Sequence, residues 1–476
     1  MSPVKRILLA SLSAVVGGAI IGTIAYTAAS NGATSPPRRT VEQKARKAGP
    51  LRPLKANPRY FTDGRSGRPI YLVGSHTWWS QGDETWPVCA GYGRHGRFDF
   101  NAYLDQLQAW GHNFIRLWRV ELARWVECDL VKATKLQPWP RTGTGAAADG
   151  LPKFDLTKFD QSFFDRLRRR VVAARDRRIY VGVMLFEGFG TQLLQDAWAG
   201  HPFNSANNVN AVEADTDRNG HGIEVHRFAS PRVVRLQETY VRKVVDTLND
   251  LDNVIWEIAN EPGRGSTQWQ YHMIRFIKRY EARKPKQHPV GMTLAAPDGL
   301  NDDLFRSPAD WISPGGAPYE HAPVPADGSK VSIMDTDHVC QICGNSQVVW
   351  KNFTRGHNVI LMDPLDDDPG RVQARRAMAQ TLRWSRRIGL ARMRPSTMDC
   401  STGFCLVNPG REYLVYQPAV GPFRVNLKTT QRAFALEWFD PIEERMVPGE
   451  RVAGSYRLDL TPPFDGEAIA YLRAVR

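Results

Sequence analysis

The chain has 476 residues, of which 42% are hydrophobic and 24% are charged. This composition is typical of globular proteins, and the length accommodates one large domain and a smaller one. The formal net charge is +14 at pH 7, but residues 1–56 contribute +8 of it and leave only +6 for the other 420 residues. The chain has no helix-turn-helix, zinc-finger or RNA-binding signature, so we expect no nucleic-acid partner.

Residues 1–30 are expected to be a signal peptide or an N-terminal membrane anchor. Two basic residues, Lys5 and Arg6, precede an uncharged stretch over residues 7–29. This stretch is longer than the roughly 7–15 apolar residues of a signal peptide, and a run above about 18 residues can span a bilayer. Both alternatives predict an extracytoplasmic protein, either secreted or tethered to the membrane. Residues 31–56 are expected to form a basic flexible linker.

The chain contains six cysteines, and an even number in an oxidising compartment predicts disulfide bonds. We expect pairing between residues close in sequence, namely Cys89–Cys128, Cys340–Cys343 and Cys400–Cys405. The alternative is a zinc site that combines the four later cysteines. Zinc thiolates suit a reducing compartment better, so the disulfides are favoured.

From residue 57 to residue 390, short apolar runs alternate with long amphipathic stretches. The expected strands cover residues 69–78, 113–120, 179–188, 253–262, 289–298, 310–314, 330–339 and 358–367, of which 310–314 is the weakest. The expected helices cover residues 99–111, 158–178, 230–251, 266–283, 345–356 and 371–389. The runs are apolar throughout, as is typical of strands buried on both faces. Eight such units predict an α/β fold, a (β/α)8 TIM barrel.

Two long segments, residues 121–154 and 189–229, follow the second and third expected strands. In a barrel they leave the C-terminal ends of strands, so we expect them to shape a substrate cleft. Within the second segment, residues 215–224 read DTDRNGHGIE. Asp215, Asp217 and Asn219 have the spacing of the first ligands in a calcium-binding loop. This stretch lacks the flanking helices and the glutamate at position twelve of an EF-hand.

The pattern changes after residue 391. Short segments rich in β-branched and aromatic residues are separated by glycine and proline, as in EYLVYQP, AFALEWFD and AIAYLRAV. Residues 391–476 are therefore expected to form a small antiparallel β-sandwich, whose first hairpin covers residues 401–418.

Polar side chains mark the ends of most expected barrel strands. Because these ends meet at one rim of a barrel, we expect their side chains to lie close together. The candidates, in chain order, are His76, Trp78, Arg116, Trp118, Glu187, Asn260, Glu261, Asp335, Asp337, His338 and Asp363. Two carboxylates on different strands, with an arginine and aromatic walls, suit cleavage of a glycosidic bond. One carboxyl group protonates the leaving oxygen, and the other attacks the anomeric carbon or activates water.

The stretch NVIWEIANEP, residues 253–262, resembles the fourth-strand signature of glycoside hydrolase clan A, the cellulase-like, family 5-type (β/α)8 barrels. GHNFIRLW, residues 111–118, resembles the second-strand pattern of that clan. The C-terminal module resembles the small β-sandwich of collagen-binding type that often follows such barrels. The resemblance implies that Glu261 is the general acid/base, that Asn260 contacts the 2-hydroxyl of the sugar, and that Arg116 lies near the nucleophile.

The chain departs from the clan at the seventh strand, where the clan has a glutamate nucleophile and this sequence reads IMDTDHV. Asp335 and Asp337 are two residues apart, so both can face the same side of a strand. We expect one of them to act as nucleophile and favour Asp337, which lies nearer the end of the strand. The separation of the two carboxyl groups distinguishes retention, at about 5–5.5 Å, from inversion, at about 6.5–9.5 Å.

The sequence therefore predicts an exported, retaining glycoside hydrolase that acts on a poly- or oligosaccharide and requires no cofactor or metal. It predicts no oligomeric state. Two alternatives stay open. The missing seventh-strand glutamate favours a non-catalytic carbohydrate- or cell-wall-binding protein on a degenerate barrel. Asp335, Asp337 and His338 instead favour a metal-dependent hydrolase, since carboxylates and imidazole bind divalent ions.

Overall fold

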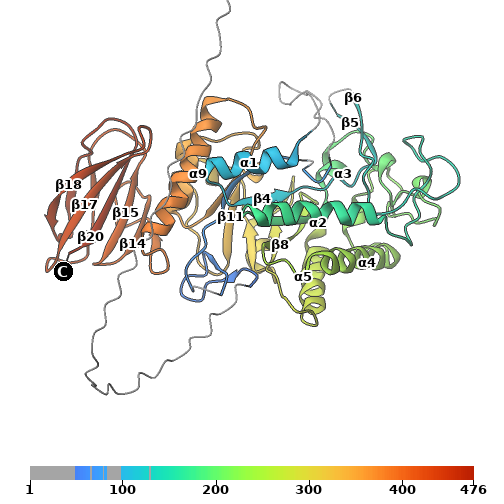
Figure 1. Ribbon diagram of the computed structural model, residues 1–476, viewed down its shortest axis with the longest axis horizontal. Coiled ribbons are helices and arrows are strands. Elements are labelled where there is room, and N and C mark those ends of the chain that lie inside the picture. The colour runs from blue at the N-terminus through green and yellow to red at the C-terminus, as the bar shows by residue number, and fades with distance from the viewer. Residues whose placement is uncertain (1–48, 65–66, 79, 83–97, 128–129, 476) are drawn as a thin grey trace, which may run out of the picture. The chain divides into compact units, whose positions relative to one another are not determined.

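The computed structural model describes residues 49–64, 67–78, 80–82, 98–127 and 130–475. Its main body is a barrel of eight parallel strands (Figure 1). In order around the barrel these are β3 (Val73–His76), β12 (Asn358–Met362), β11 (Val331–Asp335), β10 (Trp311–Ser313), β9 (Val290–Thr293), β8 (Val254–Asn260), β7 (Tyr180–Glu187) and β4 (Phe114–Leu117). The predicted (β/α)8 barrel is confirmed, and all eight expected runs form its strands.

The first and last strands of this order, β3 and β4, meet through the backbone at Val73. The backbone N–H of Asn113 donates to the Val73 carbonyl oxygen at 3.0 Å, and the backbone N–H of Val73 donates to the Asn113 side chain, at Oδ1, at 2.9 Å. The strands approach each other closely here, because a Cβ atom on Gly74 would lie 1.8 Å from the Phe114 carbonyl oxygen. Glycine at position 74 is therefore required for the barrel to close.

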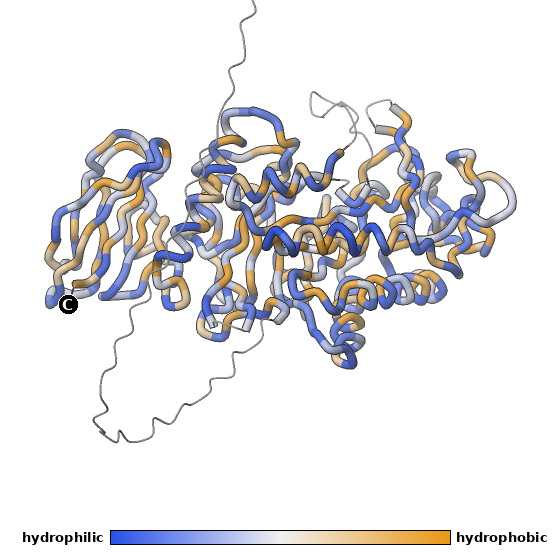
Figure 2. Tube along the Cα trace, in the orientation of Figure 1, coloured by the Kyte–Doolittle hydropathy of each residue, from blue (hydrophilic) through white to orange (hydrophobic). Residues whose placement is uncertain are grey.

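Helices surround the barrel strands (Figure 1). The six expected helices are α1 (Phe100–Trp110), α2 (Gln161–Asp176), α4 (Pro231–Leu248), α5 (Thr267–Glu281), α8 (Ser346–Thr354) and α9 (Pro369–Arg387). Two short ones, α6 (Asn301–Arg306) and α7 (Pro318–His321), complete the ring. Polar side chains cap α1, α2, α4, α8 and α9, as Asp160 does for α2 and Ser230 for α4. Figure 2 shows hydrophobic and hydrophilic residues mixed along each helix, as expected when only one face is buried.

The barrel interior is filled from its N-terminal end by apolar side chains. This cluster contains Leu51, Phe61, Leu72, Phe114, Ile255, Trp311, Val331, Ile333 and Ile360. Leu51 is only 1% exposed and precedes β1 (Arg52–Pro53), which pairs with β2 (Phe61–Thr62). The flexible linker expected up to residue 56 is therefore too long at its C-terminal end. Residues 49–56 belong to the folded body because Leu51 packs in the barrel cluster and Leu54 is buried as well.

Both insertions at the C-terminal ends of the strands carry structure of their own. The first contains the antiparallel hairpin of β5 (Arg124–Glu127) and β6 (Leu130–Ala133). The second contains α3 (Phe189–Leu193) and three 3-10 turns, η1 (Trp198–Gly200), η2 (Ser205–Asn207) and η3 (Ile223–His226). A further turn, η5 (Thr336–His338), follows β11 directly.

The C-terminal region is antiparallel, as predicted. One sheet has the order β13 (Arg394–Ser396), β14 (Cys405–Asn408), β15 (Glu412–Gln417), β20 (Ala468–Ala474), β17 (Ala433–Asp440) and β18 (Arg445–Ala453). A second sheet pairs β16 (Phe423–Val425) with β19 (Leu458–Leu460) and shares an apolar core with the first. The opposite face of the larger sheet packs on α8 and α9. Aromatic pairs mark that contact, with ring centroids 6.0 Å apart for Trp350 and Tyr416 and 5.4 Å apart for Trp384 and Tyr471.

The disulfides Cys340–Cys343 and Cys400–Cys405 form as predicted. A zinc site built from these four cysteines is therefore wrong, because their sulfurs are bonded in pairs. The third expected pair, Cys89–Cys128, and the expected signal or anchor of residues 1–30 lie outside the described residues. Within the described ranges, no helix is both long and apolar enough to cross a membrane.

The close contact at Gly74 predicts that one methyl group added there destabilises the fold. We expect Gly74→Ala to lower the free energy of unfolding by about 3 kcal/mol, because the added carbon overlaps backbone that has no room to move. Urea denaturation measures this loss. Gly49→Ala is the matched control, since its Cβ would meet only the Asp63 carbonyl oxygen, at 4.0 Å. Equal stability of the two variants would contradict the close approach of β3 and β4.

Candidate active site

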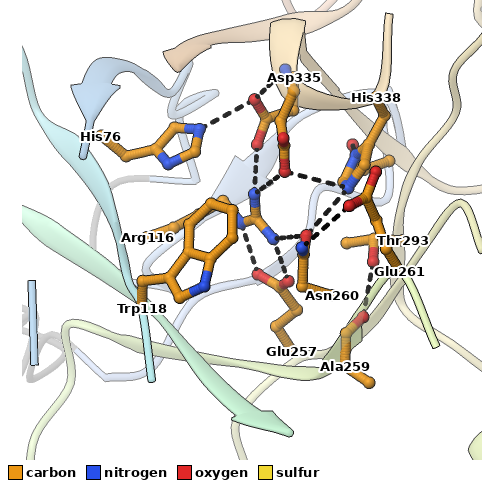
Figure 3. A network of polar contacts seen from close by, with 12 residues as sticks. His76, Arg116, Trp118, Glu257, Ala259, Asn260, Glu261, Thr293, Asp335 and His338 are labelled. Carbon is orange, nitrogen blue, oxygen red and sulfur yellow. Dashed lines mark hydrogen bonds and ion pairs between the residues drawn. The ribbon is translucent and has the colours of Figure 1, made fainter. Parts of the chain in front are cut away.

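Arg116 lies at the centre of a buried polar network inside the barrel (Figure 3). It stands two residues after Phe114 on β4, so both side chains point to the interior face of the strand. Arg116 is 2% exposed, and its guanidinium donates to Glu257 twice, from Nε to Oε2 at 2.9 Å and from Nη2 to Oε1 at 2.5 Å. Such a planar two-point contact is typical of a strong arginine–carboxylate pair.

The remaining donors of Arg116 reach the ends of β8 and β11. Nη1 donates to Asp335 Oδ2 at 2.9 Å and to Asp337 Oδ2 at 3.1 Å. Nη2 also donates to Asn260 Oδ1 at 2.7 Å. Burial alone would lower the pKa of Arg116, but the charges of Glu257 and Asp335 raise that pKa well above its usual value. One permanent positive charge therefore holds three carboxylates and one amide in place.

Asp335 is fully engaged by its neighbours. Its Oδ1 receives the Nε2–H of His76 at 2.9 Å and the backbone N–H of Asp337 at 3.0 Å, while Oδ2 receives Arg116. Burial alone would raise the pKa of Asp335, but His76 and Arg116 together hold that pKa below its usual range. Asp335 is therefore ionised and committed to hydrogen bonds within the protein.

Trp118 forms the aromatic wall of this network. Its ring stacks on His76, with centroids 5.7 Å apart and planes 19° apart, and the guanidinium carbon of Arg116 lies 4.9 Å from its centroid. These contacts fix the orientation of His76 and supply a cation–π contact to the arginine.

Glu261 and Asp337 line one open pocket of about 360 Å³ at the C-terminal ends of β8 and β11. The other lining residues are Leu294, Ala295, Ala296, Pro297, Gly299, Gly316, His338, Val339, Cys340 and Gln341. Asp337 is 8% exposed, and its Oδ1 accepts no hydrogen bond from the described residues. Unlike Asp335, it therefore presents a carboxylate oxygen that remains available to a ligand.

Glu261 has a strained backbone, with φ at +46°, a region that residues other than glycine rarely adopt. Such strain concentrates at functional sites, where the surrounding structure enforces it. Burial, and then the negative charges of Asp337 and Glu187, raise the pKa of Glu261 well above its usual value. Its carboxyl group is therefore protonated at a pH where an ordinary glutamate is ionised.

Contacts with Arg116 and His338 orient the Asn260 amide. Asn260 Oδ1 receives Arg116 Nη2 and lies 3.3 Å from His338 Nε2, while the other ring nitrogen, Nδ1, lies 3.1 Å from Ser313 Oγ. Burial lowers the pKa of His338, so the ring is neutral, accepts from the Ser313 hydroxyl and donates to Asn260. The Asn260 NH2 group consequently faces Glu261, whose Oε2 lies 3.5 Å away, and can donate to a bound hydroxyl group.

The structure brings most of the predicted site residues together. Hydrogen bonds and ring contacts join seven of them, namely His76, Arg116, Trp118, Asn260, Asp335, Asp337 and His338. Glu261 is joined to this group through Asn260. Glu187 lies close enough to raise the pKa of Glu261, but its own carboxylate receives the Gly190 N–H at 3.2 Å. Burial and the charge of Glu121 raise the pKa of Glu187 to about 8.

Two predicted residues lie outside the network. Trp78 packs on the small apolar cluster of Leu122, Trp125 and Ala197. Asp363 is completely buried, and Arg375 on α9 donates to both of its oxygens, at 2.7 and 2.6 Å. Asp363 therefore ties β12 to α9, and its side chain is occupied by a structural ion pair.

Sequence reasoning missed Glu257 and a second buried network beside it. Glu257 lies within the apolar run VIWEIAN and was not predicted as a site residue. A charged residue in the middle of a buried strand does, however, indicate a buried ion pair. The second network centres on Glu121, which receives Arg119 Nη1 at 3.1 Å, His201 Nε2 at 3.0 Å and the Glu187 backbone N–H at 3.0 Å. Arg119 and Glu121 are two residues apart, but Glu187 and His201 lie far from them in sequence, so no local motif marks the network.

The metal-dependent alternative finds no support in this arrangement. The ligand atoms of Asp335, Asp337 and His338 do not form a three-ligand cluster, although all three residues belong to the described part of the chain. Arg116 Nη1 binds both carboxylates and supplies the positive charge that a cation would supply.

Comparison with known proteins establishes the fold but does not establish the activity. The model of a family described as a domain of unknown function, DUF6298, matches residues 121–309, less than half of the chain. No curated protein matches the sequence. A solved structure named a glycoside hydrolase has 11% identity and a TM-score of 0.56, with 89% of this chain and 97% of that chain covered. A glycoside hydrolase family 5 protein from Bacteroides vulgatus ATCC 8482 has 12% identity and a TM-score of 0.55, with coverages of 89% and 94%.

Arg116→Met tests the central ion network. It leaves three buried carboxylates without their shared cation, so we expect the free energy of unfolding to fall by about 3–5 kcal/mol at pH 7. The pKa of Asp335 is lowered in the folded state, so its stabilisation is present above the unfolded pKa of about 3.9 and is lost at lower pH. The deficit of the variant should therefore shrink as the pH falls below about 4.

Arg424→Met provides the control for this measurement. Arg424 also pairs with a carboxylate, Asp459 at 3.2 Å, but both side chains are about half or more exposed. Exposed pairs contribute less than about 1 kcal/mol, so urea denaturation of this variant should match the parent protein. A deficit for Arg116→Met that does not shrink as the pH falls from about 4 to about 2 would contradict the electrostatic role of the network.

Proposed function

We propose that the protein hydrolyses O-glycosidic bonds of a poly- or oligosaccharide, with Glu261 as general acid/base and Asp337 as nucleophile. The observation that carries this proposal is the pair of carboxyl groups in one pocket. Glu261 has a raised pKa, and Asp337 is ion-paired with Arg116. A protonated acid facing an ionised carboxylate is the combination that glycosidic cleavage requires.

In the first step, Glu261 gives its proton to the glycosidic oxygen while an Asp337 oxygen attacks the anomeric carbon. The bond from that carbon to the leaving oxygen breaks, and a glycosyl ester of Asp337 forms. Esterification removes the negative charge that helped to raise the pKa of Glu261, so Glu261 is now stable as a carboxylate. In the second step it takes a proton from water, whose oxygen attacks the anomeric carbon and releases Asp337.

The contacts favour Asp337 over Asp335 as the nucleophile. Asp335 uses both oxygens for His76, Arg116 and the backbone of Asp337, so attack by either oxygen would break these bonds. Asp337 has one oxygen bound by Arg116 and lines the pocket beside Glu261. The role of Asp335 is then to position Arg116 and the turn that carries Asp337.

Asn260 is suited to hold a sugar hydroxyl group. Its oxygen is engaged by Arg116 and His338, so only its NH2 group can turn toward a substrate. The glycoside hydrolases that share this fold support the same class of reaction, and the fold by itself does not establish it.

Two substitutions test the catalytic pair. We expect Glu261→Gln to lower kcat on polysaccharides by about 10²–10⁴-fold, because the general acid is lost. It should also remove the alkaline fall in kcat/KM, which arises when Glu261 ionises before substrate binds. Asp337→Asn should abolish turnover of activated aryl glycosides, because the attacking carboxylate is lost. Initial rates on a panel of aryl glycosides and polysaccharides measure both effects.

Asp302→Asn is the control for these variants, since its side chain is 80% exposed in a surface pair with Arg306. It should retain full activity. Failure of the parent protein to cleave any member of the panel, while it still binds one of the polysaccharides, would overturn the proposal. That result would support the alternative of a carbohydrate-binding protein on a degenerate barrel.

We further expect retention of anomeric configuration, because the proposed mechanism makes two substitutions at the anomeric carbon and each one inverts its configuration. Proton NMR during early turnover of an aryl glycoside should show the product first in the configuration of the substrate, before mutarotation. Product of the opposite configuration would mean that Asp337 activates water instead of attacking. The carboxyl groups would then be separated by about 6.5–9.5 Å in the substrate complex.

A further inference from the structure

A cluster of three carboxylates lies in the second insertion, within the stretch DTDRNGHGIE of residues 215–224. One ligand oxygen each from Asp215, Asp217 and Glu224 lies within 4.8 Å of the others. Asp215 is 5% exposed and Glu224 is 6% exposed, whereas Asp217 is open to solvent. Three like charges so close together repel one another unless a cation lies between them.

Glu224 supplies an independent sign of a ligand. Its Oε2 atom is buried and has no hydrogen-bond partner among the described residues. The other oxygen, Oε1, lies 3.4 Å from Arg227 Nη1, which is the one ion pair that the three carboxylates make within the described part of the chain. A buried carboxylate oxygen without a partner is unfavourable, because nothing replaces the water it has lost.

The backbone of the loop is shaped around the same carboxylates. Asp215 Oδ2 receives the Gly220 N–H at 2.8 Å, and Asp217 Oδ1 receives the Asn219 N–H at 3.1 Å. Gly220 has φ at +82°, a conformation that favours glycine. These contacts hold Asp215 and Asp217 on one tight turn of the loop.

We propose that Asp215, Asp217 and Glu224 bind a calcium ion. All the donors in the cluster are carboxylate oxygens, which suit hard cations, whereas zinc prefers nitrogen and sulfur ligands. Calcium accepts six to eight oxygens in irregular geometry, while magnesium requires a nearly ideal octahedron. The exposed side at Asp217 leaves room for water ligands and provides a path for the ion.

A bound ion would anchor the second insertion to the barrel. Glu224 belongs to η3, whose last residue, His226, has Nε2 3.8 Å from Glu121 Oε1. Glu121 in turn receives the backbone N–H of Glu187 at the end of β7. The site is therefore structural, it lies apart from Glu261 and Asp337, and it does not depend on the proposed glycosidase activity.

Calorimetric titration of the full chain, after treatment with a chelator, tests the site with calcium chloride as the probe. We expect one calcium ion to bind per chain and the midpoint of thermal unfolding to rise in excess calcium, because the ion binds the folded state. Glu224→Gln and Asp217→Asn should each weaken binding at least tenfold. Magnesium chloride at the same concentration should bind more weakly.

Asp196→Asn is the matched control, since it removes one exposed carboxylate from the same insertion at a residue whose φ of +54° asparagine tolerates. Its calcium affinity should equal that of the parent protein. If Glu224→Gln does not fold, the solvent-exposed Asp217→Asn variant decides the question. No binding by the parent protein, unchanged binding by Asp217→Asn, or tighter binding of magnesium would each overturn the proposal.

Discussion

The buried guanidinium of Arg116 is the interaction on which the site depends. It comes from β4, on one side of the barrel, and reaches carboxylates on β8 and β11. A buried charge is stable only when it is paired and hydrogen-bonded, so the arginine and its acceptors require one another. Because three of the acceptors, Asn260, Asp335 and Asp337, stand at or just beyond strand ends, this pairing also determines which side chains face the pocket.

The electrostatic difference between the carboxyl groups follows from their positions relative to that cation. Asp335 contacts Arg116 and His76 directly, and its pKa is lowered. Glu261 is linked to Arg116 through the Asn260 amide, and burial, followed by the negative charges of Asp337 and Glu187, raises its pKa. Carboxyl groups at one rim thereby acquire opposite protonation states, which leaves Glu261 with a proton to donate.

Sequence patterns identified the elements whose physical signal is local. Every barrel strand was found, including β10, because strands buried on both faces are continuously apolar. The strand β18 was missed, since it lies at the edge of its sheet, most of its residues are exposed, and it includes a proline and a glycine. The start of the folded body was placed at residue 57, although the buried Leu51 and Leu54 belong to it, because two leucines among prolines and basic residues carry no periodicity.

The sequence by itself determined the barrel, the antiparallel C-terminal region, the two described disulfides and the identity of most polar residues at the rim. These properties follow from hydrophobic periodicity and from the place of a residue along its strand. Only the tertiary structure decided that Asp363 turns to Arg375, that Asp335 is committed to His76, and that Glu257 completes the network around Arg116. Pairing among buried charges depends on distances between strands that are far apart in the chain, and no local pattern encodes those distances.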